Sequence, residues 1–423
     1  MPDERRPVLS VEEALARILA TVHVLEAECV ELLQAAGRVL AEPIAADRDI
    51  PPLINSAMDG YAVRGVDLDT RPPIRLQVVG DVAAGHVPDL AVEAGQAVRI
   101  MTGAPVPAGA DTVVRFEDTR PSTGSGLEPD DGAVLILKTP RSGANVRQAG
   151  EDVRAGQIVL KPGAVLRPQE VGMLAAVGCA EVAVVRRPRV AVLATGDEVV
   201  PPDQPPGPDQ IRDANSYTVA AQVQEAGGVP LLLGVARDQE ALVRQGMREA
   251  LERKADFIIT SGGVSVGDFD LVKQVLAAEG KMYFWSLNMK PGRPLAFGVV
   301  DSIPLLGLPG NPVAAMISTE LFARPALLKM QGVTDWSRPT VRARLAQPVA
   351  RKDGRRHYLR VQLRETESGY EATLTGDQGS GILNSLVQAD GLAIIPEDVD
   401  HLHVGAEVEV LPLPRVGFGR VCV

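Results

Sequence analysis

Four carboxylates follow two apolar, strand-like segments of the sequence and could bind a cation. Asp197 and Glu198 come directly after RVAVLAT, and Asp268 and Asp270 come soon after ADFIIT. In proteins, carboxylates and substrate phosphates are the usual ligands of Mg²⁺. Such residues can instead cap a following helix. If the two segments end at one edge of a sheet, the metal interpretation is favoured, with all four carboxylates as candidate ligands.

A glycine-rich loop, SGGVSVGD (261–268), offers groups that suit a phosphate. Glycine allows a tight turn and close approach of the backbone to a ligand, and the serine hydroxyls can bond the same anion. The spacing is neither that of a P-loop nor that of a dinucleotide-binding loop. The candidate residues are Ser261, Gly262, Gly263 and Ser265.

Two proline-framed segments lie further along the chain. KPGRP (290–294) carries Lys290 and Arg293 in a stiff turn, which favours an anion clamp over a solvated turn. LPGNP (308–312) contains Pro309, places Pro312 where a helix begins, and makes Asn311 the expected N-cap. This second segment could be no more than a well-made helix start, or its free amides could face the ligand.

The elements that must position these residues alternate regularly from residue 187 onward. The expected strands are 189–195, 230–236, 255–260 and 304–308, and the expected helices begin near 215, 238, 269 and 311, with Asp238 capping the second. Serial β-α units predict a parallel, doubly wound sheet. Ligands bind beyond the carboxyl ends of such strands, so the loops after 195, 260 and 308 should converge.

The rest of the chain predicts a multidomain α/β plus β protein. Ser10 and Glu13 form a capping box that opens an amphipathic helix, and LLQAAGRVLAE (32–42) predicts a second helix. Short alternating runs predict β structure elsewhere. The predicted domains are an N-terminal mixed domain (7–48 and 148–178), an inserted β module (49–147), the α/β domain (179–337) and a C-terminal β-barrel or sandwich (338–423).

Composition excludes several classes of function. A net charge of −11 in 423 residues argues against nucleic-acid or anionic-membrane surfaces. Three scattered cysteines form no disulfide framework or metal cluster, and the five histidines have no triad or metal spacing, so we assign them no role. The basic stretch RKDGRRHYLR (351–360) is a solvated face or a helper in neutralising an anion. No apolar stretch is long enough to span a membrane, which suggests a cytoplasmic protein.

Eight segments, in this order, resemble the molybdopterin molybdenumtransferase family, which includes MoeA and the E domain of gephyrin. They are SAMDGYA, MTGAPVPAGADTVV, NVRQAGEDV, TGDE, DANSY, TSGGVSVGDFD, KPGRP and GLPGNP. The resemblance implies an elongated homodimer of four domains. It also implies a reaction in which adenylylated molybdopterin and molybdate, with Mg²⁺, give molybdenum cofactor and AMP. An adenylyltransferase partner and molybdoenzyme clients are implied as well.

The resemblance also assigns functional positions. They are Asp59, Thr102, Arg147, Asp152, Glu198, Asp238, Asp268, Lys290, Pro309 and Pro312. Two departures from the family pattern are visible: Arg293 stands where a second lysine is common, and Asp390-Gly391 stands where Asn-Gly is usual. The alternatives are a molybdopterin adenylyltransferase, which shares the SGG-bearing domain, and a non-catalytic scaffold of the gephyrin E-domain type.

Overall fold

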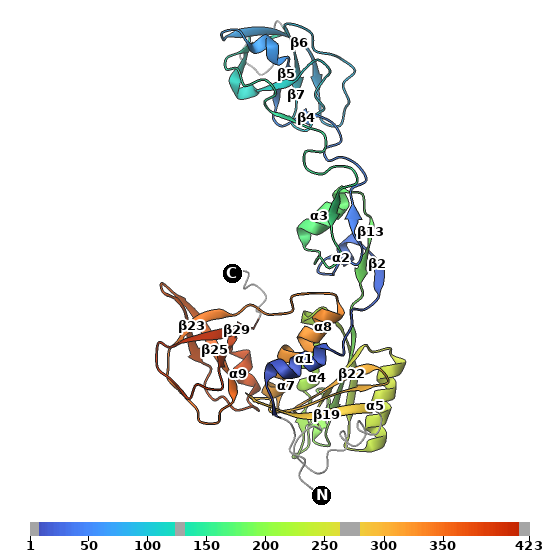
Figure 1. The fold of residues 1–423 in the computed structure, drawn as a ribbon, viewed down its shortest axis with the longest axis vertical. Coiled ribbons are helices and arrows are strands. Elements are labelled where there is room, and N and C mark those ends of the chain that lie inside the picture. The colour runs from blue at the N-terminus through green and yellow to red at the C-terminus, as the bar shows by residue number, and fades with distance from the viewer. Residues whose placement is uncertain (1–7, 123–131, 263–279, 414–423) are drawn as a thin grey trace.

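The computed structural model describes residues 8–122, 132–262 and 280–413. The chain is elongated (Figure 1), with a body and a C-terminal barrel at one end and a small β module at the other. A base domain lies between the module and the body. We call residues 27–185, which form the base domain and the module, the arm. The chain therefore passes from body to arm after the first helix and returns at residue 186.

A seven-stranded sheet forms the centre of the body, in the order β1-β19-β21-β22-β18-β14-β17. The elements of the body are β1 (Val8–Leu9), α1 (Val11–Leu19), β14 (Arg189–Thr195), β15 (Val199–Val200), β16 (Ile211–Arg212), α4 (Asn215–Glu225), β17 (Val229–Ala236), α5 (Glu240–Glu252), β18 (Phe257–Ser261), β19 (Gly280–Leu287), β20 (Met289–Lys290), β21 (Pro294–Val300), β22 (Ile303–Leu308), α7 (Pro312–Ser318), a π-helix (Thr319–Ala323) and α8 (Arg324–Met330).

Helices cover both faces of this sheet, as the doubly wound prediction requires. Val190 and Val192 of β14 pack in the same apolar cluster as α1, α4, α7 and α8. Ala191 and Leu193 pack against α5 on the opposite face. Successive residues of a strand point to opposite faces, which explains why this strand is apolar throughout.

The sheet also contains one antiparallel strand that the sequence did not predict. β14, β17, β18 and β22 are parallel, whereas β21 is antiparallel to both of its neighbours, β19 and β22. A two-residue hairpin at Asp301 and Ser302, both with positive φ, reverses the chain between β21 and β22. Short connections favour antiparallel pairing, because a parallel partner needs a long crossover.

The first helix belongs to the body and not to the predicted N-terminal mixed domain. β1 pairs in parallel with β19, and the capping box of α1 forms, with Ser10 accepting from the Glu13 backbone N–H at 3.1 Å. Ala14 and Ile18 are fully buried in the body core. The apolar face of an amphipathic helix indicates that the helix packs against another element, but not which element. For this reason the sequence placed α1 in the wrong domain.

The base domain joins two distant parts of the sequence. Its elements are β2 (Ala27–Glu31), α2 (Leu32–Ala35), β3 (Ile44–Ala45), β12 (Ile158–Leu160), α3 (Pro168–Ala176) and β13 (Glu181–Val185). β13 pairs with β2, so residues 181–185 lie here and not in the predicted α/β domain. The predicted helix 32–42 ends at Ala35, because Gly37 takes a φ of +75° and Val39 and Leu40 form β-bridges.

The module and the barrel are β structures, as predicted. The module contains β4 (Asn55–Ser56), β5 (Gly60–Val63), a 3₁₀ helix (Gly65–Leu68), β6 (Ile74–Val82), β7 (Gln96–Ile100), β8 (Thr112–Arg115), a 3₁₀ helix (Phe116–Asp118), β9 (Thr119–Pro121), β10 (Ala133–Ile136) and β11 (Val146–Arg147). The barrel contains β23 (Val341–Leu345), β24 (Val349–Ala350), β25 (Arg356–Thr366), β26 (Gly369–Leu374), α9 (Leu383–Val387), β27 (Gly391–Ile395), β28 (His401–Leu402) and β29 (Glu407–Pro412). Pairing of β25 with both β26 and β27 closes it as a ring of five strands.

Candidate active site at the sheet edge

The three predicted loops meet at the carboxyl edge of the sheet. The backbone N–H of Gly262, after β18, donates to the Leu308 carbonyl at 3.1 Å. The Asn215 side-chain amide donates to the Ser261 hydroxyl at 2.8 Å and to the Gly310 carbonyl at 2.7 Å. Asn215 is therefore the residue that ties the loops after β18 and β22 together. Asn215 lies in the DANSY segment, but the sequence pattern indicated no role for it.

Two glycines permit the close approach of these loops. Gly262 has a φ of +96°, and a Cβ there would lie 2.6 Å from the Thr195 carbonyl oxygen. Gly196 has a φ of +138°, and a Cβ would lie 2.5 Å from the Glu198 carboxylate. The positive φ disfavours a side chain at both positions, and at Gly262 contact with the Thr195 backbone excludes one as well. The Glu198 carboxylate can therefore fold back over the end of β14.

A cavity of about 1230 Å³ opens between this edge and the barrel. The predicted residues that line it are Glu198, Asp238, Ser261, Gly262, Lys290, Arg293, Pro309, Asn311 and Pro312. Asp238 does not cap α5, because Gln239 occupies the N-cap position. Its backbone N–H donates instead to Asp197 at 3.1 Å. That bond joins the loops after β14 and β17, so the Asp197 and Asp238 side chains lie on neighbouring, hydrogen-bonded loops.

The barrel forms the second wall of the cavity. β20 pairs in parallel with the start of β25, placing Lys290 opposite His357. The Asp353 carboxylate lies 2.8 Å from Nε2 of His357 and 2.7 Å from Nη2 of Arg355, with the Lys290 ammonium at 3.7 Å. Burial raises the pKa of Asp353, but the His357 and Arg355 bonds outweigh it and hold that pKa below its ordinary value. The carboxylate is therefore ionised, accepts hydrogen bonds from His357 and Arg355, and forms a longer ion pair with Lys290.

His357 is a site residue that the sequence did not identify. It lines the cavity and is buried, and burial is the main reason that its pKa lies below the ordinary value. Because ionised Asp353 can only accept, the neutral imidazole must donate from Nε2. Neither triad nor metal spacing could reveal it, since its partner is a loop carboxylate four residues earlier.

Arg360 is a second barrel residue whose place in the cavity wall the sequence did not predict. It is fully buried, and its guanidinium donates to the Ser385 hydroxyl at 3.0 Å and to the Gly379 carbonyl at 2.9 Å. Part of the basic stretch 351–360 is thus built into the cavity wall and is not a solvated face. Residues 357–361 of β25 are buried without interruption, with polar and apolar side chains mixed, so the sequence pattern indicated a strand but not a site.

Asn311 has the N-cap position of α7 but makes no capping bond with its side chain. Its amide donates instead to the Ser380 hydroxyl at 3.0 Å, and the Val313 backbone N–H donates to the Ser380 carbonyl at 3.1 Å. The start of this helix therefore holds the barrel loop 377–380 against the body. The LPGNP segment is an interdomain contact as well as a helix start.

Four predicted residues lie away from the cavity, in the arm. Asp59 accepts from the Thr102 backbone N–H at 2.7 Å and from its hydroxyl at 2.8 Å, and these bonds lower the pKa of Asp59, the backbone bond most. Arg147 lies in β11, paired with β4, and Asp152 is exposed after it. Figure 1 shows the module at the opposite end of the molecule from the body and the barrel.

Gly263, Ser265, Asp268 and Asp270, together with the helix predicted near 269, lie outside the described residues. Among the residues that are described, no three His, Cys, Asp or Glu side chains cluster as a metal site. Asp197 and Glu198 are exposed at the edge of the sheet and offer hard oxygen atoms. Nor does any described helix have the length and apolar character needed to cross a membrane.

Comparison with known proteins covers nearly the whole chain. Residues 9–178 match the "MoeA N-terminal region (domain I and II)", residues 191–329 the "Probable molybdopterin binding domain" and residues 342–413 the "MoeA C-terminal region (domain IV)". The match to the first of these spans both the base domain and the module. The three matched regions together extend over body, arm and barrel.

Curated relatives and solved structures agree with this match. A molybdopterin molybdenumtransferase from Nostoc sp. is 39% identical, covering 92% of this chain and 89% of the relative. One from Haemophilus influenzae is 35% identical, covering 96% and 98%. The crystal structure of a molybdopterin biosynthesis MoeA protein from Pyrococcus horikoshii superposes with a TM-score of 0.80 at 34% identity, covering 96% of this chain and 99% of that one. The chain therefore belongs to the molybdopterin molybdenumtransferase (MoeA) family.

Proposed function

We propose that this protein is a molybdopterin molybdenumtransferase that converts adenylylated molybdopterin and molybdate into molybdenum cofactor and AMP. The observation that carries the proposal is the cavity at the sheet edge, where carboxylates, glycine loops and cationic side chains of two domains face one ligand-sized space. That combination suits a substrate that joins a phosphate to a large polar heterocycle.

The cavity residues divide into two groups by charge. Lys290, Arg293 and Arg355 can neutralise phosphate and molybdate oxygens, while Glu198 and Asp238 face them from the sheet. Release of AMP breaks a P–O bond at the phosphate link as an oxygen of molybdate or water bonds to phosphorus, and positioning with charge neutralisation is the main demand of such a displacement. A covalent protein nucleophile is not required. The cofactor's own dithiolene sulfurs would bind the transferred metal, so no protein thiol is needed.

Mg²⁺ fits the donor set at the end of β14. Asp197 and Glu198 would hold it, and substrate phosphate oxygens would complete the shell. Asp268 and Asp270, which lie outside the described residues, are further candidates from the sequence alone. When bound, the cation would offset negative charge that develops on the phosphate. Residues of this chain would orient the substrate around it, because the Asp238–Asp197 bond joins the loops after β14 and β17 and Asn215 joins those after β18 and β22.

The arm supports a composite site in a homodimer. Asp59 and Thr102 form a hydrogen-bonded pair at the surface of the module, yet neither lines the cavity of its own chain. If both serve the reaction, a second chain must bring its module to the cavity. We therefore propose that one subunit's Asp59 and Thr102 complete the other subunit's site, and that the dimer works in the cytoplasm with the adenylyltransferase and molybdoenzyme clients as partners.

The two alternatives are less well supported. An adenylyltransferase would need only the α/β domain, whereas the barrel contributes Arg355, His357 and Arg360 to the cavity wall. A non-catalytic scaffold would not require a polar cavity held by interdomain bonds. AMP release from adenylylated molybdopterin, measured with and without molybdate, tests the proposal. Release that depends on molybdate supports it, whereas consumption of ATP with unadenylylated molybdopterin would favour the adenylyltransferase.

A further inference from the structure

The arm is joined to the body by two short segments that lie side by side. Residues 20–26 lead out of the body and residues 186–188 lead back, and the Arg186 backbone N–H donates to the Glu26 carbonyl at 3.0 Å. Beyond this point β2 and β13 continue as an antiparallel pair. Rotation at this junction would swing the whole arm, so the contacts made here decide the direction in which the module points.

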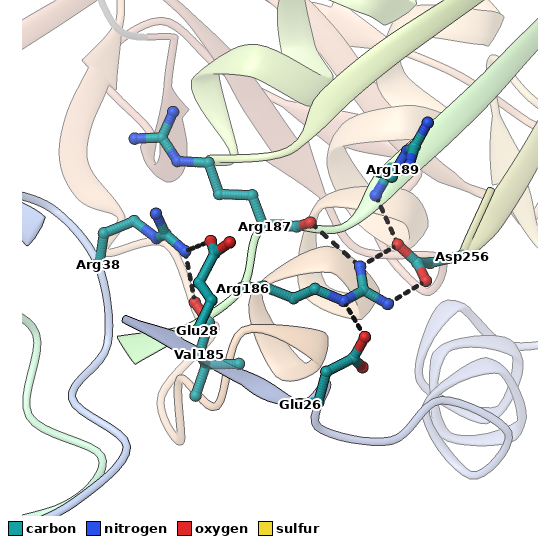
Figure 2. Close-up of polar contacts among 8 residues, drawn as sticks. All are labelled: Glu26, Glu28, Arg38, Val185, Arg186, Arg187, Arg189 and Asp256. Atoms are coloured by element: carbon teal, nitrogen blue, oxygen red, sulfur yellow. Dashed lines mark hydrogen bonds and ion pairs between the residues drawn. The ribbon is translucent and has the colours of Figure 1, made fainter. Parts of the chain in front are cut away.

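The Arg186 guanidinium binds both sides of the junction (Figure 2). Nη1 and Nη2 donate to the two Asp256 carboxylate oxygens, each at 2.6 Å, and Nε donates to the Glu26 carboxylate at 2.5 Å. A bidentate arginine–carboxylate pair fixes orientation as well as distance. The Asp256 bond is the main reason that the pKa of Arg186 is raised. The side chain therefore stays charged, as is usual for arginine in proteins.

Asp256 is a firm anchor on the body. It immediately precedes β18, its carboxylate accepts from the Arg189 backbone N–H at 2.8 Å, and its own N–H donates to the Arg189 carbonyl at 2.7 Å. Its side chain is only 12% exposed, against 68% for Glu26. Salt screens an exposed pair far more than a partly buried one. Asp256 is therefore the dominant partner and Glu26 a secondary one.

A second arginine stiffens the arm beside the junction. Arg38, which is buried, pairs with Glu28 of β2 and donates to the Val185 carbonyl at the end of β13, at 3.0 Å. The two segments therefore enter the arm as one unit (Figure 2). Arg187 differs: its side chain is exposed and points away from the cluster. Two adjacent arginines thus have opposite roles, which supplies a matched control.

We propose that Arg186 is a positioning residue that fixes the direction of the arm by clamping its two connecting segments to Asp256. The consequence for catalysis rests on the proposed function, because a directed arm matters only if Asp59 and Thr102 act in the partner's cavity. The geometric part does not depend on the reaction. It concerns only the angle between arm and body.

The direct test is a distance measurement by pulsed electron paramagnetic resonance. Spin labels are placed at Arg71→Cys in the module and Arg248→Cys on α5, both exposed, after the native cysteines are replaced by serine. Labelled chains are diluted with unlabelled chains, so that only distances within one chain are read. We expect a narrow distribution in the otherwise wild-type chain and in Arg187→Ala. It should become broad or shifted in Arg186→Ala and Asp256→Asn, with a smaller change in Glu26→Gln.

Activity separates the clamp from the proposed function. In Arg186→Ala the kcat for AMP release should fall at least several-fold, while the Kd for molybdate, measured by titration calorimetry, stays at the wild-type value because the cavity is untouched. Distances unchanged from wild type in both Arg186→Ala and Asp256→Asn would overturn the clamp. If Arg186→Ala does not fold, Asp256→Asn and Arg186→Lys carry the test. Altered distances with unchanged kcat would uphold the clamp and overturn the composite site.

Discussion

The cavity and the module hold their polar residues in opposite ways. Around the cavity, Asn215 bonds loops that are 46 and 95 residues away in sequence, and Asn311 reaches the barrel 69 residues later. In the module, Asp59 is held by Thr102 within one small β domain, and both residues are exposed. The cavity is assembled by tertiary contacts of the body and barrel. The module carries a preformed hydrogen-bonded pair, which in the composite site that we propose would act in the cavity of a second chain.

This difference predicts which substitutions should disrupt each region. Damage to one interloop bond in the body should spread through the cavity, because neighbouring loops share bonds. Damage to the junction of the arm should leave both regions intact and change only their relation. The composite-site proposal can therefore be tested by disabling the two regions separately.

The largest effect should come from complementation between the regions. Asp59→Ala and Lys290→Ala chains should each lose AMP release by about 10²-fold or more, the usual cost of losing a group that stabilises developing charge. Co-expressed as a heterodimer with two different affinity tags, they should recover up to half of the wild-type sites. If the heterodimers remain as inactive as the parent proteins, Asp59 and Lys290 act in the site of a single chain, and the contrast between the cavity and the module is wrong.

The next effect concerns the anion clamp of the cavity. Lys290→Ala should weaken binding of adenylylated molybdopterin by about 1.5–3 kcal/mol, the range for hydrogen bonds to charged groups. Titration of an inactive background measures it, with Lys352→Ala, exposed in the loop before β25, as the control. Arg293→Lys should be nearly neutral if that residue supplies charge alone. A large loss there would instead reveal a bidentate contact.

A smaller effect should follow from separating the loops. Asn215→Ala removes two hydrogen bonds, each contributing about 1 kcal/mol. We expect kcat to fall about tenfold, which is about 1.4 kcal/mol in the activation barrier. Gln224→Ala, exposed on the same helix, is the matched control. Steady-state AMP release decides the matter; equal rates in the two variants would mean that the loops need no such tie.

The smallest effect is a pH dependence of stability in the barrel. Burial lowers the pKa of His357, so the unfolded chain takes up a proton at a higher pH than the folded chain does. The contribution of His357 to stability is therefore complete above its unfolded pKa of about 6.5 and is lost as pH falls through that value toward the lower folded pKa. Between pH 5 and 7.5, the Tm of the barrel measured by calorimetry should change with pH by roughly 2 °C less in His357→Gln than in the wild type.

Exposed His401 gives the reference for that experiment, since His401→Gln should leave the pH profile as it is in the wild type. A His357→Gln profile as steep as the wild-type one would show that other groups dominate. Asp353 does not confuse the interpretation, because its lowered pKa keeps it ionised throughout this window.

Local patterns determined most of the elements of this protein. Apolar runs predicted four strands of the body, β14, β17, β18 and β22, and alternating runs predicted β structure in the module and the barrel. The capping box at Ser10 predicted the start of α1 correctly. The convergence of the loops after β14, β18 and β22 followed from topology alone, because parallel strands end at one edge. Motifs in a fixed order were enough to indicate the family.

Tertiary structure decided the partners. An apolar stripe on α1 fits any apolar surface, so only the fold could assign it to the body. The reversal of β21 depended on a hairpin at two non-glycine residues, which carries a weak sequence signal. Arg360 and Arg186 bond to segments brought together from far along the chain, and His357 lies opposite Lys290 of a distant strand. The burial and charge pairing of these residues depend on segments that meet only in the folded chain. For that reason the sequence predicted the loops of the site but not the barrel residues that line its second wall.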